Sequence, residues 1–304
     1  MLERTMRTTI LLLLLLSLLT ACGGAVSAPS PEVGGAGGTT QGTLLVVASI
    51  APLADFTRHV GGERVRVELM VPPGASPHTY EPTPAQLRTL SQARLLVLNG
   101  VGLEFWADDV VEAVGNPDLV VVRTAEGLEI VQGDEHGGGN PHVWLDPLNA
   151  IHQVERIRDA LIQVDPEGEA IYRANADRYV AELKALDREI RETVATFSSR
   201  KFIAFHAAWI YFARRYGLEQ AAVVERSPGK EPSPAEIAEV VQTAKAIGAR
   251  AIFAEPQFPT KAAQVIAAES GAQVLLLNPL GLPPDYDYLE MMRYNLGEMA
   301  KALK

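Results

Sequence analysis

The sequence is poor in cysteine and contains no apolar run long enough to cross a bilayer. Cys22 is the only cysteine among 304 residues, so an internal disulfide is excluded. The apolar run near the N-terminus, residues 10–19, is ten residues long, whereas a membrane-spanning helix needs about 20. A disulfide-stabilised fold and a retained transmembrane anchor are therefore both disfavoured.

Positive charge is also scarce. The chain has 27 Lys and Arg against 37 Asp and Glu, a formal net charge of −10. Removal of residues 1–21 would leave 25 basic against 36 acidic residues, a net charge of −11. Because nucleic-acid phosphates attract basic surfaces, we expect no nucleic-acid partner. A diffuse negative charge attracts cations in general but identifies no ligand.

The first 42 residues have the features of an export and anchoring segment. Arg4 and Arg7 precede the apolar run, and small residues close it, as in a secretory signal. The sequence LTAC, residues 19–22, resembles the bacterial lipobox, in which the cysteine becomes the acylated first residue. Residues 22–42 are rich in Gly, Ser and Pro and favour a flexible tether. We predict a lipoprotein signal peptide at 1–21, a lipid anchor at Cys22 and an extracytoplasmic location at the cell membrane; the alternative is an ordinary secretory signal with an incidental thiol.

From residue 43 onward, short β-branched runs alternate with longer helical stretches, which is typical of βαβ units on a parallel sheet. Helical patterns cover, for example, residues 83–93 and 233–248. We predict an α/β fold with two similar lobes, each built on a parallel sheet. The candidate strands are 44–49, 65–71, 94–99 and 119–123 in the first lobe, and 201–206, 221–225, 249–255 and 272–278 in the second.

One long helix is predicted between the lobes. Residues 169–199 contain neither Gly nor Pro, and apolar residues from Tyr172 to Phe197 recur every three, four or seven positions, which places them on one helix face. Asp165 and Pro166 favour a helix start, because an acid and a proline both suit the first turn. The predicted boundaries are 43–165 for the first lobe, 166–199 for a stiff connecting helix and 200–304 for the second lobe.

Three histidines occupy places where ligands bind in α/β proteins. His78 lies in a proline-rich loop, His142 in the segment NPHVWLDP, and His206 at the end of a predicted strand. Glu255 and Asn278 also end predicted strands. Since ligands bind outside the carboxyl ends of parallel strands, we expect these five residues to approach one cleft.

Neutral imidazole is a favoured ligand of zinc and related ions, which need three or four ligands. Any one of the histidines could instead be a hydrogen-bonded structural residue. The three are separated by 64 residues each, so a local zinc finger or a metalloprotease helix is excluded. Each ligand would have to come from a different loop.

Six motifs in order along the chain carry a resemblance to a known family. They are PHTYEPTPAQ, NPHVWLDPLNA, FHAAWIYFARRYGL, EPSPAEI, IFAEPQF and YLEMMRYNL. Together they resemble the zinc- and manganese-binding solute-binding lipoproteins of bacterial ABC metal importers, a group that includes adhesin-type proteins. The resemblance implies two α/β lobes joined by a long helix, with the metal bound in the cleft between them.

The resemblance also implies a ligand set. His78, His142 and His206 match the family's ligand positions, and a histidine rather than a carboxylate at 206 favours zinc over manganese. The family commonly has a carboxylate where this chain has Asn278, so the fourth ligand is open. Asn278 could coordinate through its amide oxygen, or a water could take that place. Glu255 could be a direct ligand or an acceptor for an imidazole N–H, or a structural residue at the strand end.

With this resemblance, the sequence predicts a monomeric, non-enzymatic receptor that binds Zn²⁺ with high affinity, and the resemblance implies delivery of the ion to an ABC importer permease. Mn²⁺ is the alternative transported ion. A different class, a zinc hydrolase with Glu255 as base, would use the same three histidines and an open position. A third hypothesis is an adhesin in which the metal serves only stability.

Overall fold

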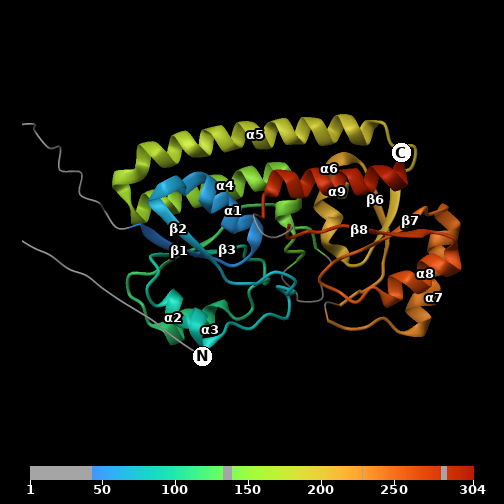
Figure 1. Cartoon of the computed structure of the whole chain (residues 1–304), viewed down its shortest axis with the longest axis horizontal. Coiled ribbons are helices and arrows are strands. Elements are labelled where there is room, and N and C mark those ends of the chain that lie inside the picture. The colour runs from blue at the N-terminus through green and yellow to red at the C-terminus, as the bar shows by residue number, and fades with distance from the viewer. Residues whose placement is uncertain (1–42, 133–138, 228, 282–285) are drawn as a thin grey trace, which may run out of the picture. The chain divides into compact units, whose positions relative to one another are not determined.

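Each half of the chain forms a parallel β-sheet within the residues that the structure describes, which are 43–132, 139–227, 229–281 and 286–304. The structure is a computed structural model (Figure 1). The predicted signal peptide, the tether and Cys22 lie outside the described residues. Within the described ranges, no helix is long and apolar enough to cross a membrane.

The two sheets have the same strand order. In the described residues the first sheet runs β2-β1-β3-β4 and the second β6-β5-β7-β8, with every pair parallel. The two-lobed parallel fold is thus confirmed, and no predicted strand end differs from the observed one by more than two residues. The strands are β1 (Leu44–Ala48), β2 (Val65–Leu69), β3 (Leu95–Leu98), β4 (Val120–Arg123), β5 (Lys201–Ala204), β6 (Glu219–Val223), β7 (Ala251–Ala254) and β8 (Gln273–Leu276).

Helices connect the strands, and several begin at the caps that the sequence provides. Thr83 and Ser233 each form a capping box with a Gln or Glu three residues later, and Asp146 accepts a hydrogen bond from the Leu148 amide. The helices are α1 (Ala51–Gly61), α2 (Pro84–Leu90), α3 (Ala107–Val114), α4 (Pro147–Val164), α5 (Glu169–Ala195), α6 (Ile210–Tyr216), α7 (Pro234–Ile247), α8 (Lys261–Ser270) and α9 (Tyr288–Leu303), with 3-10 turns η1 (Gly62–Arg64), η2 (Val143–Leu145), η3 (Pro166–Gly168) and η4 (Ala207–Trp209).

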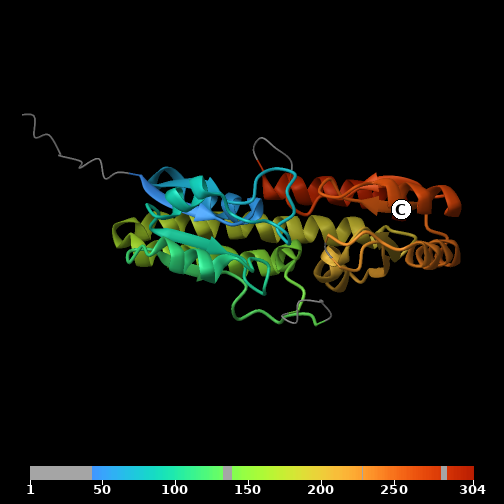
Figure 2. The same cartoon turned by 90° about the horizontal axis from the view of Figure 1, so that it is seen from below.

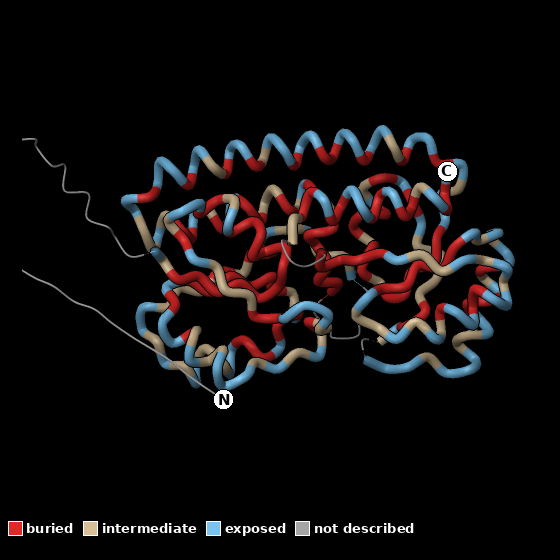
Figure 3. Tube along the Cα trace, in the orientation of Figure 1, coloured by how far each residue is buried: buried red, intermediate tan, exposed pale blue. Residues whose placement is uncertain are grey.

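Both faces of the central strands are buried, which explains their almost unbroken apolar sequences. Along β1, Val46 and Ala48 face the large core that also contains α4 and α5, whereas Leu45 and Val47 pack on the opposite face toward α2 and α3. The strands of the second sheet alternate in the same way, with Ile203 in a smaller core beneath α7 and α8. Figure 3 shows the central strands as buried, between helices on which buried and exposed residues alternate.

The connector α5 is shorter than the predicted 166–199. Residues 166–168 form the turn η3, and the regular helix begins at Glu169. The Asp165 carboxylate accepts two hydrogen bonds from Arg64 at 2.8 and 2.9 Å, so it does not cap the helix. From there α5 packs against α1 and α4 of the first lobe and α6 and α9 of the second (Figures 1 and 2).

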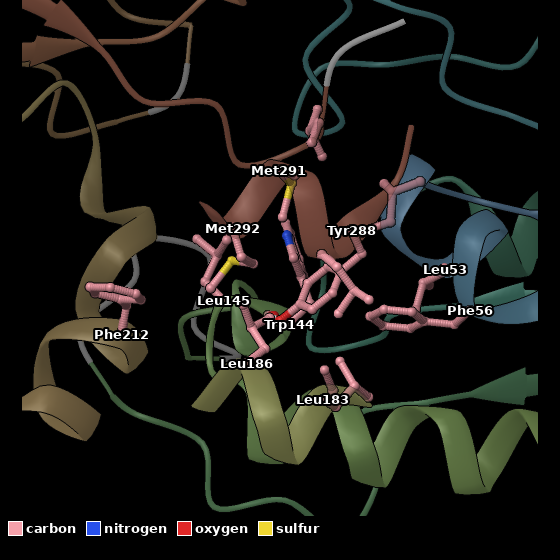
Figure 4. Close-up of a cluster of buried hydrophobic side chains, with 14 of the residues drawn as sticks. Leu53, Phe56, Trp144, Leu145, Leu183, Leu186, Phe212, Tyr288, Met291 and Met292 are labelled. Carbon is pink, nitrogen blue, oxygen red and sulfur yellow. The ribbon is translucent and has the colours of Figure 1, made fainter. Parts of the chain in front are cut away.

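The two lobes share one hydrophobic core. The predicted apolar stripe of α5 is buried, including Leu183 and Leu186. Figure 4 shows this stripe beside side chains from both lobes, such as Phe56 of α1 and Phe212 of α6. Contacts of this kind unite Gly42–Lys304 into one compact unit.

Candidate metal centre

His78 is held by a loop that cannot form regular secondary structure. The loop lies between β2 and α2, and the prolines at 72, 73, 77 and 82 deny it both helix geometry and strand hydrogen bonds. Backbone hydrogen bonds from Ala75 to Pro72 and from Thr79 to Ser76 fold it into two turns. His78 itself is half-buried. The loop therefore presents the imidazole from a stiff and exposed support.

His142 is positioned by Asn140, two residues earlier. The Asn140 side-chain oxygen accepts hydrogen bonds from both the backbone amide and the Nδ1 of His142, each at 3.0 Å. The Asn140 amide nitrogen donates to the carbonyl of Ala207 at 2.7 Å, and its own carbonyl accepts from the Tyr211 hydroxyl at 2.7 Å. Asn140 thus ties the first lobe's histidine to the segment that follows His206.

His206 and Glu255 come from neighbouring strands. His206 follows β5 and Glu255 follows β7, and these strands pair in parallel, so both side chains reach the same sheet edge. The two residues are 5% and 1% exposed. Their side chains meet in a 2.6 Å contact between His206 Nδ1 and Glu255 Oε1.

The structure brings the three predicted histidines together. The Nε2 atom of His142 lies 3.1 Å from that of His78 and 3.0 Å from that of His206. The rings meet at interplanar angles of 46°, 69° and 82°, so their edges converge. In the described residues, these three form the group of side chains that could hold a metal ion.

The hydrogen bonds on the far sides of two rings define their tautomers. Asn140 donates its amide to Ala207, so its oxygen must accept the proton of His142 Nδ1. A carboxylate oxygen faces His206 Nδ1, so that nitrogen also carries a proton. When both rings are neutral, each Nε2 atom carries a lone pair directed at the other.

Two lone pairs 3.0 Å apart repel each other unless a cation lies between them. A tetrahedral zinc ion with Zn–N bonds of 2.0–2.1 Å would place its nitrogen ligands about 3.3 Å apart. The observed separations of 3.0 and 3.1 Å are within a few tenths of an ångström of that value. The ligand atoms of all three histidines lie within 4.8 Å of one another, so the group is compact enough to close around one transition-metal ion.

A proton is a poor substitute for that ion at His142. Burial, reinforced by the neighbouring His206 and His78 imidazoles, holds the pKa of His142 well below its ordinary value of 6.5. The ring therefore stays neutral and able to coordinate metal at pH values where an exposed histidine is charged.

Glu255 lines the same small cavity as the three histidines, whereas Asn278 lines the larger cavity beside it. Glu255 accepts the His206 Nδ1 proton behind the ring, which is the second of the two ligand-related roles expected for it; direct coordination stays a prediction. The Asn278 oxygen accepts hydrogen bonds from the Leu280 amide at 3.0 Å and from Gln257 at 3.1 Å. Its role as fourth ligand also stays a prediction.

Two residues beside the centre were not singled out from the sequence. Asn140 precedes a proline, and the pattern Asn-Pro-His could have indicated a side-chain turn that orients the histidine. Gln257 lines the same small cavity as the three histidines. Only its spacing of two residues from Glu255 in the motif AEPQ links it to the site.

The comparison with known proteins agrees with this geometry. A family described as zinc-uptake complex component A, periplasmic, matches residues 46–302 of the chain. The chain belongs to this zinc-uptake family. The resemblance drawn from the six motifs is therefore confirmed.

Zinc-uptake and manganese-binding proteins are similar to the chain over most of its length. The chain is 30% identical over 279 residues to the high-affinity zinc uptake system protein ZnuA of Bacillus subtilis, covering 86% of this chain and 88% of the relative. It is 32% identical over 268 residues to the manganese-binding lipoprotein MntA of Halalkalibacterium halodurans, with coverage of 86% and 88%. A crystal structure of ZnuA has a TM-score of 0.80 and 36% identity, covering 86% of this chain and 99% of that one.

Proposed function

We propose that this protein is an extracytoplasmic receptor that captures a transition-metal ion, zinc in the first place, and delivers it to the permease of an ABC importer. The observation that carries the proposal is the convergence of three imidazoles, with His142 Nε2 lying 3.1 Å from that of His78 and 3.0 Å from that of His206. Membership of a zinc-uptake family supports the delivery role. Similar proteins are named for zinc and for manganese, which supports a transition-metal ion as the cargo.

The ligand set favours zinc over manganese. All three grouped side chains are imidazoles, and nitrogen donors bind Zn²⁺ more tightly than Mn²⁺, which relies more on carboxylate oxygen. Glu255 lies behind His206 and compensates charge at a distance. Manganese remains the alternative cargo, as the similarity to a manganese-binding lipoprotein suggests.

Anchoring and assembly complete the proposal. Acylation at Cys22 would hold the folded body near the outer face of the cytoplasmic membrane, with residues 23–42 as the tether. We expect the protein to act as a monomer without enzymatic activity. Mass spectrometry of protein extracted from membranes would find a diacylglyceryl modification at Cys22, and an unmodified thiol there would contradict the anchor.

The alternative function from a different class of protein is a zinc hydrolase. Its general base would need to reach a metal-bound water, but Glu255 is 1% exposed and its Oε1 is engaged by His206. Turnover of ester, peptide or phosphate substrates by the zinc-loaded protein would favour the hydrolase. No turnover above that of free zinc would favour the receptor.

Metal content and affinity test the receptor directly. Protein purified without added metal should carry close to one equivalent of zinc by elemental analysis, and the stripped protein should rebind Zn²⁺ more tightly than Mn²⁺ in calorimetric titrations. His142→Ala should weaken zinc binding by more than about 100-fold, since the loss of a direct ligand exceeds that of a residue behind one. The matched control is His152→Ala, because His152 lies on α4 and its ring contacts the Glu126 carbonyl outside the metal centre. Equal affinities in the two variants would refute the site.

A further inference from the structure

Gln257 has a buried oxygen beside the metal centre that no described residue satisfies. Its Oε1 atom is inaccessible to solvent and has no hydrogen-bond partner. The residue lies on the wall of two adjoining cavities, one of about 10 Å³ at the three histidines and one of about 300 Å³ outside it. Since buried amide oxygens are almost always paired, the position of this oxygen calls for a partner.

The direction of the Gln257 amide is set by Asn278. The Asn278 oxygen accepts a hydrogen bond from the Leu280 backbone amide, and its nitrogen donates to the Gly281 carbonyl. The orientation of Asn278 is therefore fixed by backbone groups at both ends. Gln257 approaches the Asn278 oxygen at 3.1 Å and can satisfy it only with its NH₂ group. The Gln257 oxygen must then point away from Asn278.

The small cavity limits what can satisfy that oxygen. A volume of about 10 Å³ is close to the minimum for a single water molecule, so it has room for one ion or one water. The other polar side chains on this wall are the three histidines, Ser76 and Glu255. The Glu255 carboxylate is held by His206 Nδ1, on the side of that ring away from Nε2. The Nε2 atoms of His142 and His206 face each other at 3.0 Å, so a cation between them would be favourable. One ion at this point would satisfy the nitrogen lone pairs and the amide oxygen together.

We propose that the Gln257 side-chain oxygen is the fourth donor to the ion held by His78, His142 and His206. This inference rests on the proposed function. Asn278 then acts as a positioning residue that aims the Gln257 amide and does not itself touch the metal. The predicted fourth ligand is thereby replaced by its neighbour in space, 21 residues earlier in the chain.

A neutral fourth donor has a consequence for selectivity. Three imidazoles and an amide bring no negative charge into direct contact with the ion, and manganese depends more on carboxylate oxygen than zinc does. Gln257→Glu should therefore tighten Mn²⁺ by a larger factor than Zn²⁺ and lower the ratio of the two affinities by about tenfold or more. Gln257→Ala should weaken Zn²⁺ by about tenfold.

The experiment compares wild type, Gln257→Ala and Gln257→Glu with the matched controls Gln264→Ala and Gln264→Glu, since Gln264 is exposed on α8. Zn²⁺ and Mn²⁺ affinities are measured by competition with chelators. The visible spectrum of the Co²⁺-loaded proteins is recorded with and without azide. Azide should bind where water has replaced the Gln257 oxygen, so the Gln257→Ala spectrum should change and the wild-type spectrum should not.

The outcomes separate this inference from the receptor role. If wild type binds Zn²⁺ tightly but Gln257→Ala leaves both affinity and azide response unchanged, Gln257 is not a donor and the receptor role stands. An azide response in wild type equal to that in Gln257→Ala would also overturn the inference. Failure of wild type to bind Zn²⁺ would overturn both. An affinity ratio for Zn²⁺ over Mn²⁺ that is unchanged in Gln257→Glu would contradict the assignment independently of the alanine variant.

Discussion

Glu255→Gln should weaken zinc binding although Glu255 lies behind a ligand. The carboxylate accepts the His206 Nδ1 proton at 2.6 Å and is 1% exposed, so its charge acts through the ring with little screening by solvent. Loss of such a partner typically costs 10- to 100-fold in metal affinity, or about 1.4–2.8 kcal/mol. Glutamine can still accept the proton, so this loss would measure the charge rather than the hydrogen bond.

The same substitution should have the opposite effect on the metal-free fold. The second oxygen of Glu255 is buried without a hydrogen-bond partner among the described residues, and burial of an ionised carboxylate is costly. Replacing it by a neutral amide should leave the metal-free melting temperature unchanged or raised. Zinc affinity would be measured by chelator competition and stability by circular dichroism. Glu269→Gln, at an exposed position on α8, is the matched control.

A double-mutant cycle would show whether Glu255 acts through His206. If it does, Glu255→Gln should cost less than about 0.5 kcal/mol of zinc binding in a His206→Ala background, because the intermediary is gone. An equal loss in both backgrounds would refute the reasoning and point to direct contact between Glu255 and the ion.

Three further predictions follow from the same site and its supports. Between pH 7.5 and 5.5, zinc affinity should fall by at most about 100-fold per pH unit, because the lowered pKa of His142 leaves only two imidazoles with a proton to lose on binding. A fall of about 1,000-fold per pH unit in calorimetric titrations would contradict this. The same lowered pKa means that His142 favours the metal-free fold above about pH 6.5 and that this contribution is lost as pH falls toward the folded-state value, so melting temperatures should decrease on acidification. Tyr179→Phe should destabilise the protein by about 1–3 kcal/mol, because it leaves the buried Asp55 carboxylate without the hydroxyl that donates to it at 2.8 Å; denaturant melts that match wild type would count against that hydrogen bond.

Much of the fold follows from local sequence. The strands are apolar runs of β-branched residues, and such runs form parallel strands wherever helices cover both faces. The apolar stripe of α5 could also be predicted, because it follows the helical repeat within a single segment. The start of α5 could not be predicted in this way, because Asp165 is engaged by Arg64, which lies 101 residues earlier in the chain. A capping residue can be recognised from sequence, but a distant competitor for its carboxylate cannot.

In the candidate site, too, the residues that depend on local features could be predicted and the one that depends on tertiary contacts could not. The three histidines could be predicted because strand ends and stiff loops are local features that topology brings to one edge. Gln257 could not, since its importance depends on which way the Asn278 amide faces. That direction is set by the Leu280 amide and the Gly281 carbonyl. Hydrogen-bond direction between amides is a property of the assembled fold and leaves no periodic signal in the sequence.

The common core of the two lobes bears on how a bound ion can leave. Swinging the lobes apart would pull Phe56 and Phe212 out of a core that α5 holds together, and would break the Trp144–Pro279 hydrogen bond of 2.7 Å. Displacing the loop that carries His78 disturbs far less buried surface, and His78 is the only one of the three imidazoles that is half-buried rather than buried. The free-energy cost of releasing the ion is therefore lowest at His78. A partner protein that binds this loop could release the ion while the rest of the molecule stays rigid.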